Sequence, residues 1–290
     1  YEETIMREAD GSQEIDSTEA YSLKFNQTYV AGYLSDSWSP FKRLTLKPGV
    51  RISRNSYRPK TLIEPRFDFA FDPIGDAKTL IRGGFNLYYE RMNSYVQQFE
   101  NYPMMSVIYY DPAGNITGDS SETYRSIEVD PNLKYPKTYE WTIGLDRELW
   151  KDFSVQANYV HRKYKDQLFT KYINLRDPIT LERADPTKGA ITWYGNLGYN
   201  NYDGLTFTFQ KRFSHGYQFL FSYSHQISKG NSNLFTDFSM IQTVFRDRAM
   251  YTNTKQQYEY SGPTSFDKPF DIKFFGSAML PLKFMFSTVI

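Results

Sequence analysis

Apolar and polar residues alternate one by one along residues 202–213 and again along residues 217–227. In the first segment, Phe207 and Phe209 fall on one side and Thr208 falls on the other. A period of two is typical of β-strands, because successive side chains point to opposite faces of a sheet. Since only a three-residue turn separates the two segments, the sequence predicts a β-hairpin with one apolar and one polar face.

The apolar face of this hairpin is mainly aromatic, since Tyr217, Phe219, Phe221 and Tyr223 continue it in the second segment. A soluble β-sandwich would also alternate, but its inward face would mix valine, isoleucine and leucine. An aromatic outside combined with a polar inside suits a barrel in lipid. The predicted fold class is therefore all-β, a transmembrane antiparallel β-barrel.

About ten segments are expected to be strands, joined by links that are alternately short and long. Outer-membrane barrels have short periplasmic turns and long outer loops, so the alternation predicts the orientation of the chain. The expected strands are 20–38, 43–54, 62–72, 78–91, 137–149, 153–172, 202–213, 217–229, 269–280 and 283 onward. The short links are 39–43, 72–78, 150–152, 214–216 and 281–283, and the long links are 55–61, 92–136, 173–201 and 230–268.

The same two-sided pattern predicts a charged ladder inside the barrel. Along residues 62–72, aromatic residues such as Phe67 share one face and charged residues share the other. The ladder comprises Glu64, Arg66, Asp68 and Arg82. We expect these side chains to pair with one another rather than to contact a substrate directly.

Composition agrees with a barrel and excludes other classes. The mean hydropathy is −0.61, and no run of 18 apolar residues is present, which excludes transmembrane helices. The 25 Tyr and 23 Phe are typical of transmembrane strands. A hydropathy scan does not detect such strands, because half of their residues face the lumen and are polar. With 34 basic and 33 acidic residues, the net charge of +1 gives no electrostatic footprint for nucleic acid.

The residue inventory predicts neither a cofactor nor a metal site. The chain has no cysteine, which excludes disulfides and thiolate ligands, and its three histidines lack the spacing of a metal motif. The acidic segment 1–19 departs from the spacing of a calcium loop and is expected to be a solvated loop. No nucleophile-elbow, phosphate-loop or dinucleotide motif is present, so we do not expect an enzyme.

The long links supply the candidate ligand-binding residues, because loops on a rigid scaffold commonly carry recognition. Aromatic and arginine side chains are typical of binding hot spots, although loops also pack against one another through such residues. The candidates are Trp193 and Tyr194 in the 173–201 link, and Phe238, Arg246, Arg248 and Tyr251 in the 230–268 link.

Several segments, in their order along the chain, resemble the barrel of TonB-dependent transporters, in particular the Oar-like group. They are an aromatic strand that ends in Asp36-Ser37-Trp38, the run Leu44-Thr45-Leu46-Lys47-Pro48-Gly49-Val50-Arg51, the pair Pro65-Arg66, and the strand that begins Arg82-Gly83-Gly84-Phe85. With Tyr135-Pro136-Lys137-Thr138-Tyr139 and the hairpin, the resemblance covers roughly residues 20–290. These motifs are structural, so they identify the scaffold better than the ligand.

The resemblance implies a bacterial outer-membrane location and a barrel of about 22 strands, of which residues 20–290 would form a part with about ten. It also implies a plug domain that does not lie in this chain, and the ladder of Glu64, Arg66, Asp68 and Arg82 would contact that plug. The implied partners are outer-membrane lipid, a TonB-type energy-coupling complex that acts through the plug, and other outer-membrane or surface proteins.

The implied activity is passage of a ligand, such as a peptide, a glycan, a chelate or a larger cargo, across the outer membrane. Two alternatives use the same barrel: a surface adhesion or assembly-scaffold protein, and a passive porin that needs no energy coupling. The motifs above do not separate them, because all three would keep an aromatic outside and a polar lumen.

Overall fold

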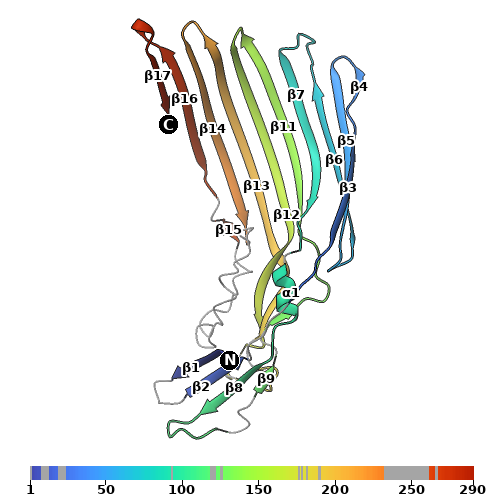
Figure 1. Cartoon of the computed structure of the whole chain (residues 1–290), viewed down its shortest axis with the longest axis vertical. Coiled ribbons are helices and arrows are strands. Elements are labelled where there is room, and N and C mark those ends of the chain that lie inside the picture. Colours follow the sequence, from blue (N-terminus) through green and yellow to red (C-terminus); the bar gives the residue numbers. More distant parts are fainter. Residues whose placement is uncertain are drawn as a thin grey trace.

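The computed structural model describes residues 2–7, 13–18, 24–92, 94–117, 122–124, 127–175, 177, 179–180, 182–188, 191–231, 261–264 and 267–290. Ten strands of its main sheet follow one another in sequence order, each antiparallel to the next (Figure 1). They are β3 (Tyr29–Ser35), β5 (Leu44–Asn55), β6 (Thr61–Phe71), β7 (Thr79–Tyr89), β11 (Lys137–Trp150), β12 (Phe153–Ile173), β13 (Ile191–Ser214), β14 (Tyr217–Gly230), β16 (Phe270–Met279) and β17 (Met285–Val289).

Three further short strands pair with strands of this sheet. Strand β4 (Trp38–Phe41) pairs with β5, and β15 (Gly262–Pro263) pairs with β14. Strand β10 (Ile127–Val129) runs parallel to the first part of β13. Among the described residues, no helix is long and apolar enough to cross a membrane.

Each of the ten expected strands is present in the expected order, beside the short strands β4, β10 and β15, and the boundaries differ most at two places. Strand β3 begins at Tyr29 rather than at residue 20, and β13 begins at Ile191 rather than at residue 202. The expected link 173–201 therefore shrinks, because β12 and β13 continue as a paired ribbon. Two register shifts in β12, between Tyr164 and Phe169, disturb the alternation there.

The expected acidic loop over residues 1–19 is wrong at two places. Residues Glu2–Arg7 form β1 and residues Gln13–Thr18 form β2, which belong to a second sheet with β8 (Met105–Tyr110) and β9 (Glu122–Tyr124). In its backbone register, residue 5 pairs with residue 15, which pairs with residue 108. Isoleucine, which each of these three strands contains, favours strand formation, a sequence signal that the many acidic residues concealed.

The strand register confirms the predicted division into two faces. One row across three strands joins Phe209, Phe221 and Phe274, and another joins Phe85 with Trp141. We call this side of the sheet the aromatic face. The opposite side, the polar face, carries rows such as Thr208 with Ser222, and Arg82 with its neighbours on β11 and β12.

All five short turns lie at one end of the sheet, since each connects an alternate pair of strands. We call this the turn end and the opposite end the loop end (Figure 1). Aromatic side chains gather beside the turns, and Trp150 stacks on Phe153 with ring centroids 4.4 Å apart. Trp38, Phe41, Trp150 and Phe213 are exposed there, as expected of a girdle at the level of lipid headgroups.

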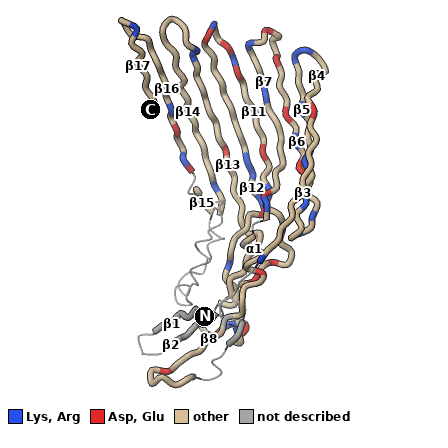
Figure 2. The backbone as a smooth tube through the Cα atoms, viewed as in Figure 1, with Lys and Arg blue, Asp and Glu red and all other residues tan. Residues whose placement is uncertain are grey.

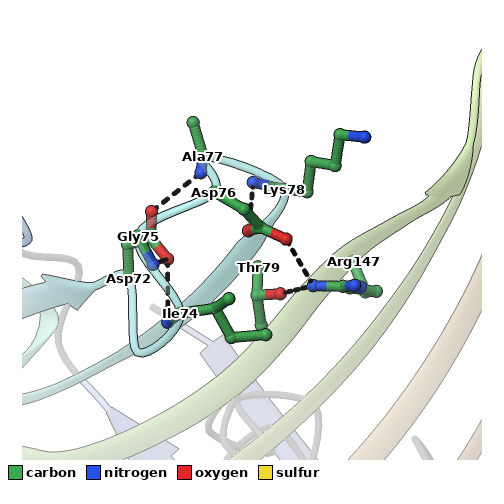
Figure 3. A network of polar contacts seen from close by, with 8 residues as sticks. All are labelled: Asp72, Ile74, Gly75, Asp76, Ala77, Lys78, Thr79 and Arg147. Atoms are coloured by element: carbon green, nitrogen blue, oxygen red, sulfur yellow. Dashed lines mark hydrogen bonds and ion pairs between the residues drawn. The ribbon is translucent and has the colours of Figure 1, made fainter.

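The turn between β6 and β7 shows how these short connections are fixed (Figure 3). One carboxylate oxygen of Asp72 accepts hydrogen bonds from the backbone amides of Ile74 and Gly75, and the other accepts one from Ala77. These bonds, above all that from Gly75, hold the pKa of Asp72 below its usual value. Gly75 has φ of +81°, a conformation that favours glycine.

At the loop end, the link between β7 and β11 folds over the sheet. It contains helix α1 (Ser94–Glu100), whose buried Val96 and Phe99 pack in a core cluster with residues of the strands. Arg58 pairs with Glu100 and donates to the carbonyl of Pro131 at 2.9 Å. The full buried cluster is Leu62, Met92, Val96, Phe99, Ile127, Leu133, Tyr135, Leu168 and Tyr194.

Candidate functional site

The candidate site is a row of charged and aromatic side chains on the polar face. The Arg66 guanidinium lies over the ring of Tyr88 at 4.8 Å, and the Tyr88 hydroxyl donates to Glu140 Oε1 at 3.5 Å. Arg162 Nε donates to Glu140 Oε2 at 2.6 Å and its guanidinium lies 5.6 Å from the ring centre of Tyr202. The row therefore crosses five strands, from β6 to β13.

A second group lies on the same face nearer the turn end. Arg82 Nε donates to Asp146 Oδ2 at 2.9 Å, and the same guanidinium also contacts the side-chain oxygen of Asn158. These three residues come from β7, β11 and β12. Pairing across strands fixes the position of the Arg82 guanidinium beside β11 and β12.

Glu64 and Asp68 have partners on neighbouring strands. Glu64 is only 4% exposed; its Oε1 accepts a hydrogen bond from the Tyr89 amide at 2.7 Å, and its Oε2 lies 3.4 Å from Arg51 Nε. Asp68 accepts a hydrogen bond from Asn86 at 3.5 Å. The four predicted ladder residues thus contact neighbours on adjacent strands rather than one another, which differs from the expected pairing among them. Their contact with a plug stays a prediction.

Glycines on the polar face make this arrangement sterically feasible. A Cβ added to Gly84 would collide with the carboxylate of Asp68, and one added to Gly144 would lie 2.5 Å from the Asn158 side-chain oxygen. Gly83, by contrast, faces the ring of Phe69 on the aromatic side. The two strands keep their register through all three glycines, so these residues provide room rather than a bulge.

One buried polar atom of the row lacks a partner. Arg66 Nε is buried and has no hydrogen-bond partner within the described part of the chain. An unsatisfied buried donor on a charged group costs free energy, so this position is incomplete as it stands. Arg66 is therefore a position on the polar face where an additional acceptor would be stabilising.

The structure separates the loop candidates. Trp193 and Tyr194 lie within strand β13 rather than in a loop, so their predicted placement is wrong. Tyr194 is 1% exposed and meets Phe99 of α1 edge-on at 5.3 Å, while the Lys171 ammonium lies 4.4 Å from the ring centre of Trp193. Phe238, Arg246, Arg248 and Tyr251 lie outside the described residues.

The described residues offer no metal-binding cluster of three or more histidine, cysteine or acidic side chains. One polar trio lies on the aromatic face, where His161 Nδ1 and the Tyr159 hydroxyl both meet Asp203 Oδ1. The His161 ring also packs 5.4 Å from Trp141. Asp203 Oδ1 therefore has its hydrogen-bond partners within this trio.

Residues 52–286 match the family described as outer membrane beta barrel domain. The chain belongs to this family. It is an all-β, transmembrane antiparallel barrel portion located in the bacterial outer membrane, which confirms the predicted fold class and location.

Relatives of the barrel domain are known at low identity. The protein YddB of Escherichia coli strain K12, described as uncharacterized, is 25% identical over 250 residues, which cover 83% of this chain and 28% of YddB. A solved structure described as the outer membrane transporter YddB from Escherichia coli superimposes with a TM-score of 0.61 at 19% identity, over 91% of this chain and 32% of that chain. The chain thus spans about a third or less of YddB.

A second solved structure has a similar fold. The siderophore receptor PirA from Pseudomonas aeruginosa superimposes with a TM-score of 0.52 at 13% identity, over 79% of this chain and 42% of that chain. At such identities the likeness concerns the fold. It agrees with a sheet that forms part of a larger barrel.

In a barrel within lipid, the aromatic face must contact the hydrocarbon and the polar face must border the lumen, since unpaired charges are costly in lipid. Sequence reasoning missed part of the lumenal row, namely Tyr88, Arg162 and Tyr202. The signal was available, because the alternation that places Phe207 outside also places Tyr202 inside. It becomes useful only once the register joins Glu140, Arg162 and Tyr202 in one row.

Proposed function

We propose that this chain is a portion of the barrel of a TonB-dependent outer-membrane transporter of the Oar-like group. The proposed transporter moves a peptide, glycan, chelate or larger cargo, is driven from the inner membrane through a plug, and carries out no enzymatic chemistry. The descriptions of YddB as a transporter and of PirA as a siderophore receptor agree with this role.

The observation that carries the proposal is the incomplete charged row in the lumen. A passive, water-filled pore would solvate its lining cations, whereas Arg66 Nε is buried without a partner within the described strands. A plug seated in the lumen would supply an acceptor to the Arg66 guanidinium, which has no ion pair among the described residues, and would lie beside the Arg82–Asp146 pair. Burying such pairs is favourable only when their hydrogen bonds are satisfied.

The test compares cells that carry the full-length protein with and without the inner-membrane motor. A gated transporter keeps the outer membrane tight to small antibiotics in both strains, and uptake of its ligand requires the motor. High permeability of the wild type that does not depend on the motor would instead establish a passive porin.

A further inference from the structure

A group of lysines lies on the aromatic face where its apolar surface ends. On β12, the outward residues change from Val155, Ala157 and Tyr159, through His161, to Lys163 and Lys165. A transmembrane strand needs about 9–11 residues, so a span that begins at Phe153 ends close to Lys163. The change from apolar to basic therefore marks the upper limit of the hydrocarbon at the loop end.

The strand register brings further lysines to the same place. Lys163 faces Asn201 of β13, which in turn faces Lys229 of β14, and Lys165 faces Lys137 of β11. Since neighbouring strands are about 4.8 Å apart, Lys163 and Lys229 are roughly 10 Å apart along the sheet. We call Lys163, Lys165 and Lys229 the rim lysines.

The rim lysines are not neutralised by the protein. All three are exposed, and none forms an ion pair among the described residues. The two acidic groups nearby are engaged elsewhere, as Asp166 pairs with Lys137 at 3.0 Å and Asp203 bonds His161 at 2.8 Å. Lys165 lies opposite Lys137, whose charge Asp166 offsets, so the rim lysines themselves are the cations that an external anion could pair with.

An aromatic side chain completes the surface. Tyr139 faces Lys163 in the register, and the ammonium groups of Lys137 and Lys165 lie 6.0 Å and 5.8 Å from its ring centre. Tyrosine at this level is typical of the boundary between hydrocarbon and headgroups. The surface thus combines an apolar wall below, an aromatic ring at the boundary and unpaired cations above.

We propose that the rim lysines bind the phosphate groups of a phosphorylated glycolipid of the outer leaflet, whose acyl chains lie along the aromatic face beneath. Charge and depth both fit this occupant, because the cations follow immediately above the hydrocarbon level and face away from the lumen. The proposal depends on the loop end facing outward but not on transport, so it can fail while the proposed function holds.

The experiment uses the purified full-length protein in detergent and three probes: rough-type lipopolysaccharide, the same lipopolysaccharide after removal of its phosphates, and inorganic phosphate. Native mass spectrometry measures bound lipid, and thermal unfolding measures stabilisation. We expect the wild type to retain the phosphorylated lipid at least tenfold more than the dephosphorylated form. Inorganic phosphate alone should give little stabilisation.

The matched variants are Lys163→Gln/Lys165→Gln/Lys229→Gln and a control that removes three exposed lysines of the turn end, Lys78→Gln/Lys151→Gln/Lys283→Gln. One lysine near an anionic membrane surface contributes roughly fivefold in affinity, so the rim variant should lose at least about tenfold and the control almost nothing. Equal retention by both variants would overturn the proposal. Equal retention of the phosphorylated and dephosphorylated lipids by the wild type would also overturn the proposal, even if the rim variant assembles poorly.

Discussion

At the residue scale, the facing of single side chains decides their tolerance to charge. Phe207 lies on the aromatic face opposite Tyr223, whereas the adjacent Thr208 lies on the polar face opposite Ser222. We expect Phe207→Arg to destabilise the folded barrel by about 2–4 kcal/mol if the site is near the midplane, and Thr208→Arg to be much milder. Folding yields in lipid measure the difference, and equal yields would contradict the assigned faces.

Asp72 makes a second prediction at this scale, because its pKa is lowered by the amides of the β6–β7 turn. A lowered folded-state pKa stabilises the turn above the unfolded value near pH 4 and loses that stabilisation as the pH falls through the folded value. Asp72→Asn keeps only one acceptor oxygen. We expect the Asp72→Asn variant to be less stable than the wild type at pH 7, and the two stabilities to become similar below pH 3.

Urea unfolding at several pH values measures this effect. Glu182→Gln, in the exposed loop between β12 and β13, is the control and should follow the wild type at every pH. A constant difference between Asp72→Asn and the wild type from pH 7 to pH 2 would contradict the role given to the Asp72 carboxylate.

At the element scale, Tyr194 links strand β13 to helix α1. Its hydroxyl is buried without a hydrogen-bond partner among the described residues, whereas its ring packs against Phe99. We expect Tyr194→Phe to be neutral or slightly stabilising, since it removes an unsatisfied polar atom. Tyr194→Ala should cost about 3–5 kcal/mol through the cavity that it leaves.

Limited proteolysis of the 92–136 link reports this packing directly. Faster cleavage is expected for Tyr194→Ala alone. Faster cleavage of Tyr194→Phe would show that the hydroxyl has a partner after all and would contradict the structural role assigned to the ring.

The elements that sequence patterning predicts well are those with an unbroken period of two. The β13–β14 hairpin from Tyr202 onward is such a case, since lipid on one side and lumen on the other enforce strict alternation. The start of β13 is not, because Gly195 and Gly198 fall at register shifts and carry no polarity signal. Helix α1 is too short to show a helical period, and its packing against Leu62 and Leu168 is long-range information.

The candidate site was predictable only in part for the same reason. Alternation along β6 places Glu64, Arg66 and Asp68 on the polar face, as the register confirms. The partners Arg162 and Tyr202 depend on how β11, β12 and β13 are aligned, and a shift of one residue would reverse their faces. Trp193 was assigned to a loop because the pattern fades before Tyr202.

At the scale of the whole molecule, the five short turns define one side of the membrane. The chain has no cysteine, so single cysteines introduced in it report sidedness by comparison with the unsubstituted protein. We expect Ile179→Cys, at a position 89% exposed between β12 and β13, to react with a membrane-impermeant maleimide on intact cells. Lys151→Cys, in a short turn, should react only after the outer membrane is opened; the reverse result would invert the orientation.

Charged residues bear on whether the lumen of the barrel is closed. Basic and acidic residues recur along the strands (Figure 2), and the register assigns many of them to the polar face. We infer that this face meets a plug, with Arg66 and Arg82 among its contacts. A lumen closed in this way should open when both cations are removed, while the lipid-facing surface is unchanged.

The most direct test is therefore the permeability of cells that carry the full-length protein with Arg66→Ala/Arg82→Ala, in a strain that lacks the inner-membrane motor. The control, Lys78→Ala/Lys151→Ala, removes two exposed cations of the turn end. The gated-transporter account predicts that the first variant admits small antibiotics while the wild type and the control do not, at equal amounts of assembled barrel. Permeability that is already high in the wild type and unchanged in the variant would contradict it.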